Sequence, residues 1–178
     1  MTDTSLVITM IGPDRPGIVS AISDKAVEFG ANWTDSVMAN FAGQFAGVAH
    51  LMVASEKSEA LRAALLSLDS PGMRITVALG DGAKSAIAPA VRHLKLDLVG
   101  NDHPGIIHRI SSQLAGQGIS IEKLQTEVVN GAFTGEQMFQ MKARLAVPMA
   151  LGNDELRTGL ESLANELMVD ISMDDSAA

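Results

Sequence analysis

The chain has 178 residues, of which 47% are hydrophobic and 19% charged, so it holds enough apolar surface for packed cores and a disordered chain is excluded. Its formal net charge of −8 and its pI of about 4.8 argue against direct binding of DNA or RNA, which requires a basic surface. The sequence has no cysteine, which excludes disulfides and thiolate metal sites.

The first half of the chain is predicted to contain four strands and two helices. Apolar residues are spaced two apart in the strands and three or four apart in the helices. Pro16 suits the first turn of the first helix, and Gly30 is the type of residue that follows a helix end. The predicted elements are a strand over residues 6 to 11, a helix from Pro16 to Gly30, strands over 31 to 41 and 44 to 54 with a turn at Ala42 and Gly43, a helix over 57 to 69, and a strand over 73 to 79.

The second half of the chain repeats the first. The sequence Gly-Pro-Asp-Arg-Pro-Gly-Ile-Val at residues 12 to 19 returns as Gly-Asn-Asp-His-Pro-Gly-Ile-Ile at residues 100 to 107, a shift of 88 positions (100 − 12). Two copies indicate a duplicated domain, because a solenoid needs about three or more stacked units. At the same shift, residues of the predicted hairpin also match: Gly43, Phe45 and Gly47 correspond to Gly131, Phe133 and Gly135.

The repeat predicts the same elements in the second copy. Leu61 matches Leu156 at a larger shift, so we expect a short insertion around residues 146 to 152, where Pro148 ends a longer strand. The expected elements are a strand over residues 94 to 99, a helix with Ile106, Ile110 and Leu114 on its apolar face, a hairpin over about 119 to 146, a helix with Leu156, Leu160, Leu163 and Leu167, and a strand with Val169, Ile171 and Met173.

The order β-α-β-β-α-β in each copy predicts an α+β fold, the ferredoxin-like arrangement in which two helices cover one face of an antiparallel sheet. Small and polar residues between the copies are typical of a linker. We predict a first domain over residues 1 to 80, a linker over 81 to 91 and a second domain over 92 to 178. Edge strands of such sheets often pair with a neighbour, so we expect a homo-oligomer.

The loop before each long helix is the candidate ligand site. The first backbone N–H groups of a helix have no intrahelical partner and lie at the positive end of its dipole, so they can bind a carboxylate. Asp14 and Asp102 could accept the ammonium group of an amino acid, or they could merely cap the helices. The predicted ligand-binding residues are Gly12, Pro13, Asp14, Arg15, Pro16, Gly17, Ile18 and Asn32 in the first copy, and Asn101, Asp102, His103, Pro104, Gly105, Ile106 and Ser120 in the second.

The motif Gly-x-Asp-x-Pro-Gly-Ile in a β-α-β-β-α-β module, followed after the helix by Gly-x-Asn, resembles the ACT domain, a small-molecule regulatory module. A chain of two such domains is similar to the glycine cleavage system transcriptional repressor family. The resemblance implies a regulator that senses an amino acid, with glycine favoured, and acts on transcription through an activator protein. It also implies that Asn32 helps to hold the ligand, whereas the second copy has Ser120 at that position and His103 in place of Arg15.

Other chemistries find little support in the sequence. No nucleophile, phosphate-loop or metal-helix motif is present, so we expect neither an enzyme nor a cofactor. His103 and His108 lack partners at a convincing metal spacing, and Trp33 is interpreted as a packing residue. No apolar run is long enough to span a membrane, and the N-terminal residues do not resemble a signal peptide, so we expect a cytoplasmic protein.

Three other functions remain open at this point. The chain could be a protein-interaction module whose loops bind nothing, or an allosteric regulator of an enzyme of amino-acid metabolism. A repressor that contacts DNA directly is the third, and the acidic composition disfavours it. The leading hypothesis has two partners, a small amino acid and a transcriptional activator protein, and involves neither nucleic acid nor membrane.

Overall fold

The structure is a computed structural model that describes residues 2–80, 90–131 and 135–175. The chain divides into two compact units, Met1–Ala86 and Ile87–Ala178. Residues 81 to 89 of the predicted linker lie outside the described residues, and Val91 is the first residue of a strand of the second unit. Within the described ranges, no helix is long and apolar enough to cross a membrane.

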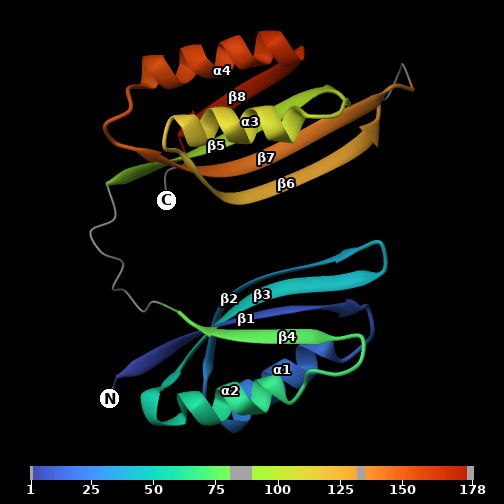
Figure 1. Ribbon diagram of the computed structural model, residues 1–178, viewed down its shortest axis with the longest axis vertical. Helices are drawn as coiled ribbons and strands as arrows, with labels where there is room; N and C mark the ends of the chain where they lie inside the picture. The colour runs from blue at the N-terminus through green and yellow to red at the C-terminus, as the bar shows by residue number, and fades with distance from the viewer. Residues whose placement is uncertain (1, 81–89, 132–134, 176–178) are drawn as a thin grey trace. The chain divides into compact units, whose positions relative to one another are not determined.

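The first unit is a four-stranded antiparallel sheet in the order β2-β3-β1-β4, with both helices on one face (Figure 1). The left-handed residues Ala42 and Gly43 form the two-residue turn of its hairpin, as predicted. Its elements are β1 (Asp3–Pro13), α1 (Ile18–Glu28), β2 (Asn32–Phe41), β3 (Gln44–Ala54), a short 3-10 turn (Ser55–Lys57), α2 (Ser58–Leu66) and β4 (Arg74–Leu79).

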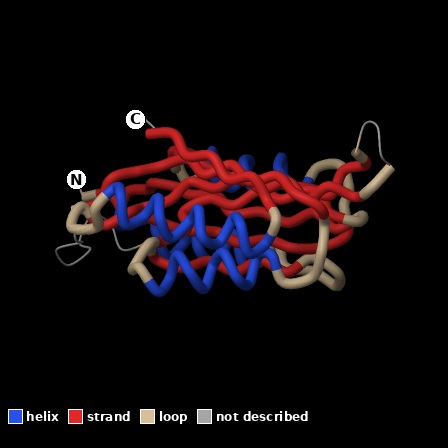
Figure 2. The backbone as a smooth tube through the Cα atoms, turned by 90° about the horizontal axis from the view of Figure 1, so that it is seen from above, coloured by secondary structure: helices blue, strands red, loops and turns tan. Residues whose placement is uncertain are grey.

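The second unit has the same architecture, with the sheet order β6-β7-β5-β8. Figure 2 shows two helices running side by side along the strands of a sheet. The predicted α+β fold with two βαββαβ repeats is therefore confirmed, and Pro148 does end a long strand. The elements are β5 (Val91–Asn101), α3 (Ile106–Gly116), β6 (Ser120–Asn130), β7 (Gln137–Pro148), α4 (Asn153–Leu167) and β8 (Val169–Asp175).

Each unit has its own apolar core between sheet and helices. In the first, Leu6, Ile8 and Met10 of β1 alternate toward the helices, and Ile22 of α1 packs on them. Trp33 packs against this core as a partly buried residue, which agrees with its interpretation as a packing residue. The second core repeats the pattern with Leu94, Leu96 and Leu98 of β5, Ile106, Ile110 and Leu114 of α3, and Leu156, Leu160, Leu163 and Leu167 of α4.

The strand register corrects the predicted site of the insertion. Gly12 lies opposite Phe45, and Gly100 lies opposite Phe139, so the predicted match of Phe45 with Phe133 is wrong. Phe133 itself lies outside the described residues, and the matches of Gly43 and Gly47 with Gly131 and Gly135 fail with it. Most of the insertion lies in the second hairpin, where residues 131 to 136 separate the strands, and not around residues 146 to 152.

Two helix ends also differ from the prediction. Pro16 lies in the turn before α1, because the left-handed Gly17 separates it from the first helical residue, Ile18. Helix α2 ends at Leu66 and not at residue 69, because the hydrogen bonds that follow span three residues instead of four. The Leu68 N–H, for example, donates to the Leu65 carbonyl at 3.1 Å. The apolar spacing continues through Leu68, which is why the sequence predicts a longer helix.

Candidate functional site

The loop between β1 and α1 leaves the start of the helix open. Gly17 is the N-cap residue with φ of 92°, a left-handed conformation that glycine adopts without a steric cost. The first turn closes with Ala21 N–H donating to the Gly17 carbonyl at 2.9 Å, and no side chain caps the helix. The backbone N–H groups of residues 18 to 20 therefore have no intrahelical partner and point to where an anion can bind.

The loop between β5 and α3 has the same backbone. Gly105 is the N-cap residue with φ of 97°, and Arg109 N–H donates to the Gly105 carbonyl at 3.0 Å. The side chain of Ile106 is buried in the core, as is that of Ile18 in the first unit. The repeated motif thus produces two helix starts of one geometry, and neither has a side-chain cap.

Asp14 ties the first loop to the neighbouring hairpin. Its carboxylate accepts a hydrogen bond from the Asn40 side-chain amide at 2.5 Å, and its backbone N–H donates to the Gly43 carbonyl at 3.0 Å. The Asn40 oxygen in turn accepts the Gly43 N–H at 3.2 Å. The reading of Asp14 as a helix cap is therefore wrong, because the carboxylate serves the hairpin and not the helix.

Asp102 is held by its backbone alone. Its N–H donates to the Gln137 carbonyl at 2.8 Å, but its side chain is exposed and makes no hydrogen bond among the described residues. The register places Val128 where the first unit has Asn40, so the amide partner is missing. Asp102 does not cap α3 either, since that helix also lacks a side-chain cap.

Arg15 and His103 make the two loops chemically different. Arg15 is exposed and has neither an ion pair nor a hydrogen bond within the described part of the chain. His103 lies with Nε2 3.3 Å from the Leu167 carbonyl at the end of α4, and with Nδ1 3.2 Å from the Pro104 carbonyl. The first loop therefore offers the unpaired guanidinium group of Arg15 to a ligand. In the second loop, the imidazole ring of His103 contacts the C-terminal end of α4 instead.

Gly12 and Gly100 serve the packing of the sheet ends. A Cβ at Gly12 would overlap the Gly72 carbonyl and would lie 2.9 Å from the Met73 Cα, and a Cβ at Gly100 would lie 2.9 Å from the Val169 Cβ. Real Cβ atoms do not approach so closely. Both glycines are therefore needed for the close approach of β4 or β8, whether or not a ligand binds.

Asn32 lies at the opposite end of its sheet from the loop. Asn32 pairs with Met52, which pairs with Ser5, whereas the loop begins after Pro13 at the other end of β1. Pro13 lies eight positions after Ser5 on β1, a span of about 26 Å at roughly 3.3 Å per residue. Ser120 occupies the same register position in the second unit. The structure therefore does not bring Asn32 and the loop of its own unit together.

A hollow of about 180 Å³ adjoins the first loop. Its walls are mostly apolar, and Arg15 is the one charged residue of its lining. Sequence reasoning missed its far wall, Leu68, Met73 and Ile75, because these residues follow the loop by more than 50 positions and only the fold brings them near. The hollow is lined by Arg15, Pro16, Gly17, Ile18, Ala21, Ile22, Leu68, Met73 and Ile75.

A metal site is not formed by the described residues. Among them, no group of three or more histidine, aspartate or glutamate side chains could hold a metal ion. His93 contacts Glu122 at 3.2 Å, and Arg144 contacts the other oxygen of the same carboxylate at 3.2 Å. This cluster lies at the start of β6 in the second unit, at the end of the sheet opposite to the loop of that unit.

Comparison with known proteins identifies the fold family. The family model of the ACT domain matches residues 4–77. The crystal structure of an unknown protein from Galdieria sulphuraria is similar over 99% of this chain and 100% of that one, with 30% identity and a TM-score of 0.84. A structure named "putative glycine cleavage system transcriptional repressor" is similar over 98% of each chain, with 18% identity and a TM-score of 0.66. A search of curated proteins gives no match.

Proposed function

We propose that this chain, which belongs to the ACT domain family and carries two ACT-like domains, is an amino-acid-sensing regulator of transcription. It responds to glycine and acts through a protein partner in the cytoplasm. The observation that supports this proposal best is the open start of α1, with its free N–H groups and the unpaired Arg15 beside them. Both features favour a carboxylate ligand. The net charge of −8 disfavours direct contact with DNA as the regulatory step.

A complete site needs a second ACT unit. A helix start contributes only about 0.3 to 2 kcal/mol, while even a millimolar dissociation constant requires about −4 kcal/mol. Asn32 cannot supply the difference within its own unit, because it lies at the far end of the sheet. We propose that a second copy of the chain supplies the remaining contacts to the ligand, which makes association and sensing part of the same event.

Glycine binding is expected to be weak and to depend on Arg15. Glycine has five heavy atoms, and a ceiling of about −1.5 kcal/mol per atom limits the dissociation constant to micromolar values at best. Replacing Arg15 by glutamine removes a charge-assisted hydrogen bond, so we expect the affinity to fall about tenfold. Titration calorimetry of glycine into the purified chain measures this change.

Arg62→Gln is the matched control, because Arg62 is a partly exposed cation of α2 that lies outside the loop and its hollow and contacts Glu59 at 3.6 Å. We expect this variant to bind glycine like the wild type. The sensor proposal is wrong if millimolar glycine, serine and alanine all give no heat, and the role of Arg15 is wrong if both variants bind equally. If none of the three amino acids gives heat, the result favours the alternative function, a protein-interaction module that binds no ligand.

The mode of regulation is tested separately. We expect a pull-down from the native organism to capture a protein whose retention changes with glycine, and we expect the purified chain alone to give no shift of DNA in a gel. A salt-sensitive gel shift by the chain alone would instead support direct DNA binding. A retained partner that is an enzyme of amino-acid metabolism would support the allosteric alternative.

A further inference from the structure

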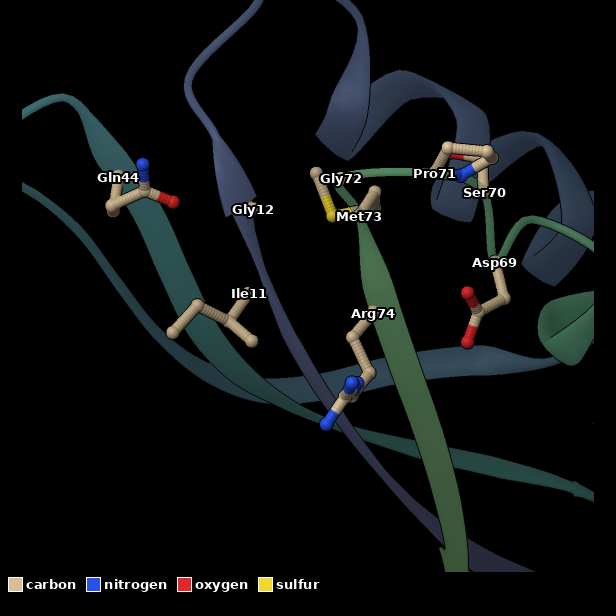
Figure 3. A pocket seen from close by; sticks show the side chains of 9 residues that line it. All are labelled: Ile11, Gly12, Gln44, Asp69, Ser70, Pro71, Gly72, Met73 and Arg74. Atoms are coloured by element: carbon tan, nitrogen blue, oxygen red, sulfur yellow. The ribbon is translucent and has the colours of Figure 1, made fainter.

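A second hollow is lined by the turn that precedes β4. It has a volume of about 630 Å³ and opens to the surface of the first unit. Figure 3 shows Gln44 on one side and the segment of Asp69, Ser70 and Pro71 on the other, with Ile11 and Arg74 between them. Of the residues predicted to bind a ligand, only Gly12 lines this hollow, so it is separate from the loop site described above.

A rigid turn forms one wall of the hollow. Ser70 N–H donates to the Met73 carbonyl at 3.0 Å, and Met73 N–H donates to the Ser70 carbonyl at 2.9 Å. Pro71 and the left-handed Gly72, with φ of 95°, occupy the two central positions, as a type II turn requires. The turn is seated on Gly12, where a side chain would overlap it. This wall is therefore fixed before any ligand arrives.

Two opposite charges line the hollow without pairing with each other. Arg74 is exposed and makes no ion pair or hydrogen bond with any described residue. The Asp69 carboxylate accepts only the Ile75 backbone N–H, at the long distance of 3.4 Å. Gln44 and Ser70 add an amide and a hydroxyl to the same lining. A cation and an anion held apart in one hollow match the two ends of a zwitterion.

The charged lining of this hollow is not repeated among the described residues of the second unit. Ile75 lies opposite Met10 and Ile171 opposite Leu98, so the register places Asp170 where the first unit has Arg74. Met138 likewise takes the position of Gln44. Helix α4 continues to Leu167, two residues before β8, so the turn of residues 70 to 73 is absent. The fold therefore does not require the charged lining, because the second unit has the same fold without these residues.

We propose that this hollow is a binding site for an amino acid with a polar side chain, which the first unit alone provides. Arg74 binds the ligand carboxylate, Asp69 binds its ammonium group, and Gln44 and Ser70 serve the side chain. The volume exceeds what glycine fills, which favours a larger ligand. This inference rests on the proposed function in one respect, namely that the ligand is an amino acid. It adds to that function a second site with a different ligand specificity.

The test is titration calorimetry of the full chain with glutamine and glutamate as probes and leucine as the apolar control. We expect one or both polar amino acids to bind and leucine not to bind at this site. Arg74→Gln should weaken polar ligand binding at least about tenfold, and Asp69→Asn should weaken it similarly. Arg62→Gln is the matched control, because Arg62 is a partly exposed cation of α2 that lines neither hollow and contacts Glu59 at 3.6 Å.

The outcomes separate this site from the loop site. Binding of glutamine or glutamate that depends on Arg15 but not on Arg74 overturns the inference and leaves the proposed function in place. Binding that depends on Arg74, with no amino acid dependent on Arg15, supports the inference and overturns the loop as the sensor. No heat with any amino acid overturns both. Fluorescence of Trp33 checks that each variant of the first unit is folded, since it is the only tryptophan and packs on that core.

Discussion

Replacing Gly12 by alanine is expected to lower the free energy of unfolding of the first unit by about 1 to 3 kcal/mol, the usual cost of inserting an atom into a packed site. The added Cβ would overlap the Gly72 carbonyl and approach the Met73 Cα to 2.9 Å. Both contacts are with backbone atoms of the closed turn at residues 70 to 73, which cannot move aside without breaking its two hydrogen bonds. We expect the cost near the upper end of that range.

The position of Trp33 allows this change to be measured in one unit. Urea unfolding followed by Trp33 fluorescence reports on the first core, and far-UV circular dichroism reports on both units. Gly116→Ala is the control, because Gly116 ends α3 with open space around it, and alanine there should stabilise the second unit by about 0.5 to 1 kcal/mol. A Gly12→Ala variant as stable as the wild type would show that the turn is not seated on β1.

The elements were predictable because their signals are local. Alternating apolar residues, the pair Ala42 and Gly43, and the glycines after α1 and α3 follow from backbone geometry within a few positions. The second hairpin was misplaced because a glycine and phenylalanine match at residues 131 to 135 imitated the first copy. Only the pairing of Gly100 with Phe139 reveals the longer hairpin, and strand pairing is a long-range property.

The candidate site was predictable only in its local part. The motif indicated the open helix start, because a glycine before a helix and free N–H groups belong to one stretch of chain. It could not indicate the bond of Asp14 to Asn40, which depends on which face of β2 carries the amide. The hollow of Asp69 and Arg74 arises because α2 ends early, and the continued apolar spacing to Leu68 concealed that end.

Replacing Leu96 by alanine is expected to destabilise the second unit by about 2 to 5 kcal/mol, the range for deleting a large buried aliphatic side chain. Leu96 is 0% exposed and lies on β5, which has a paired strand on each side and both helices above it. Its neighbours belong to rigid strands and helices, so the cavity has little scope to collapse. Denaturant unfolding followed by far-UV circular dichroism measures the loss.

Leu124→Ala is the matched control, since Leu124 lies on the edge strand β6 and is 41% exposed. The free energy of unfolding lost in Leu124→Ala should be less than half that lost in Leu96→Ala, because water already reaches the side chain of Leu124 in the folded unit. The two cores share no residue, so the Trp33 transition should stay unchanged in both variants. If the Trp33 transition moves together with the loss of circular dichroism in Leu96→Ala, the two units unfold as one and their free energies of unfolding are coupled.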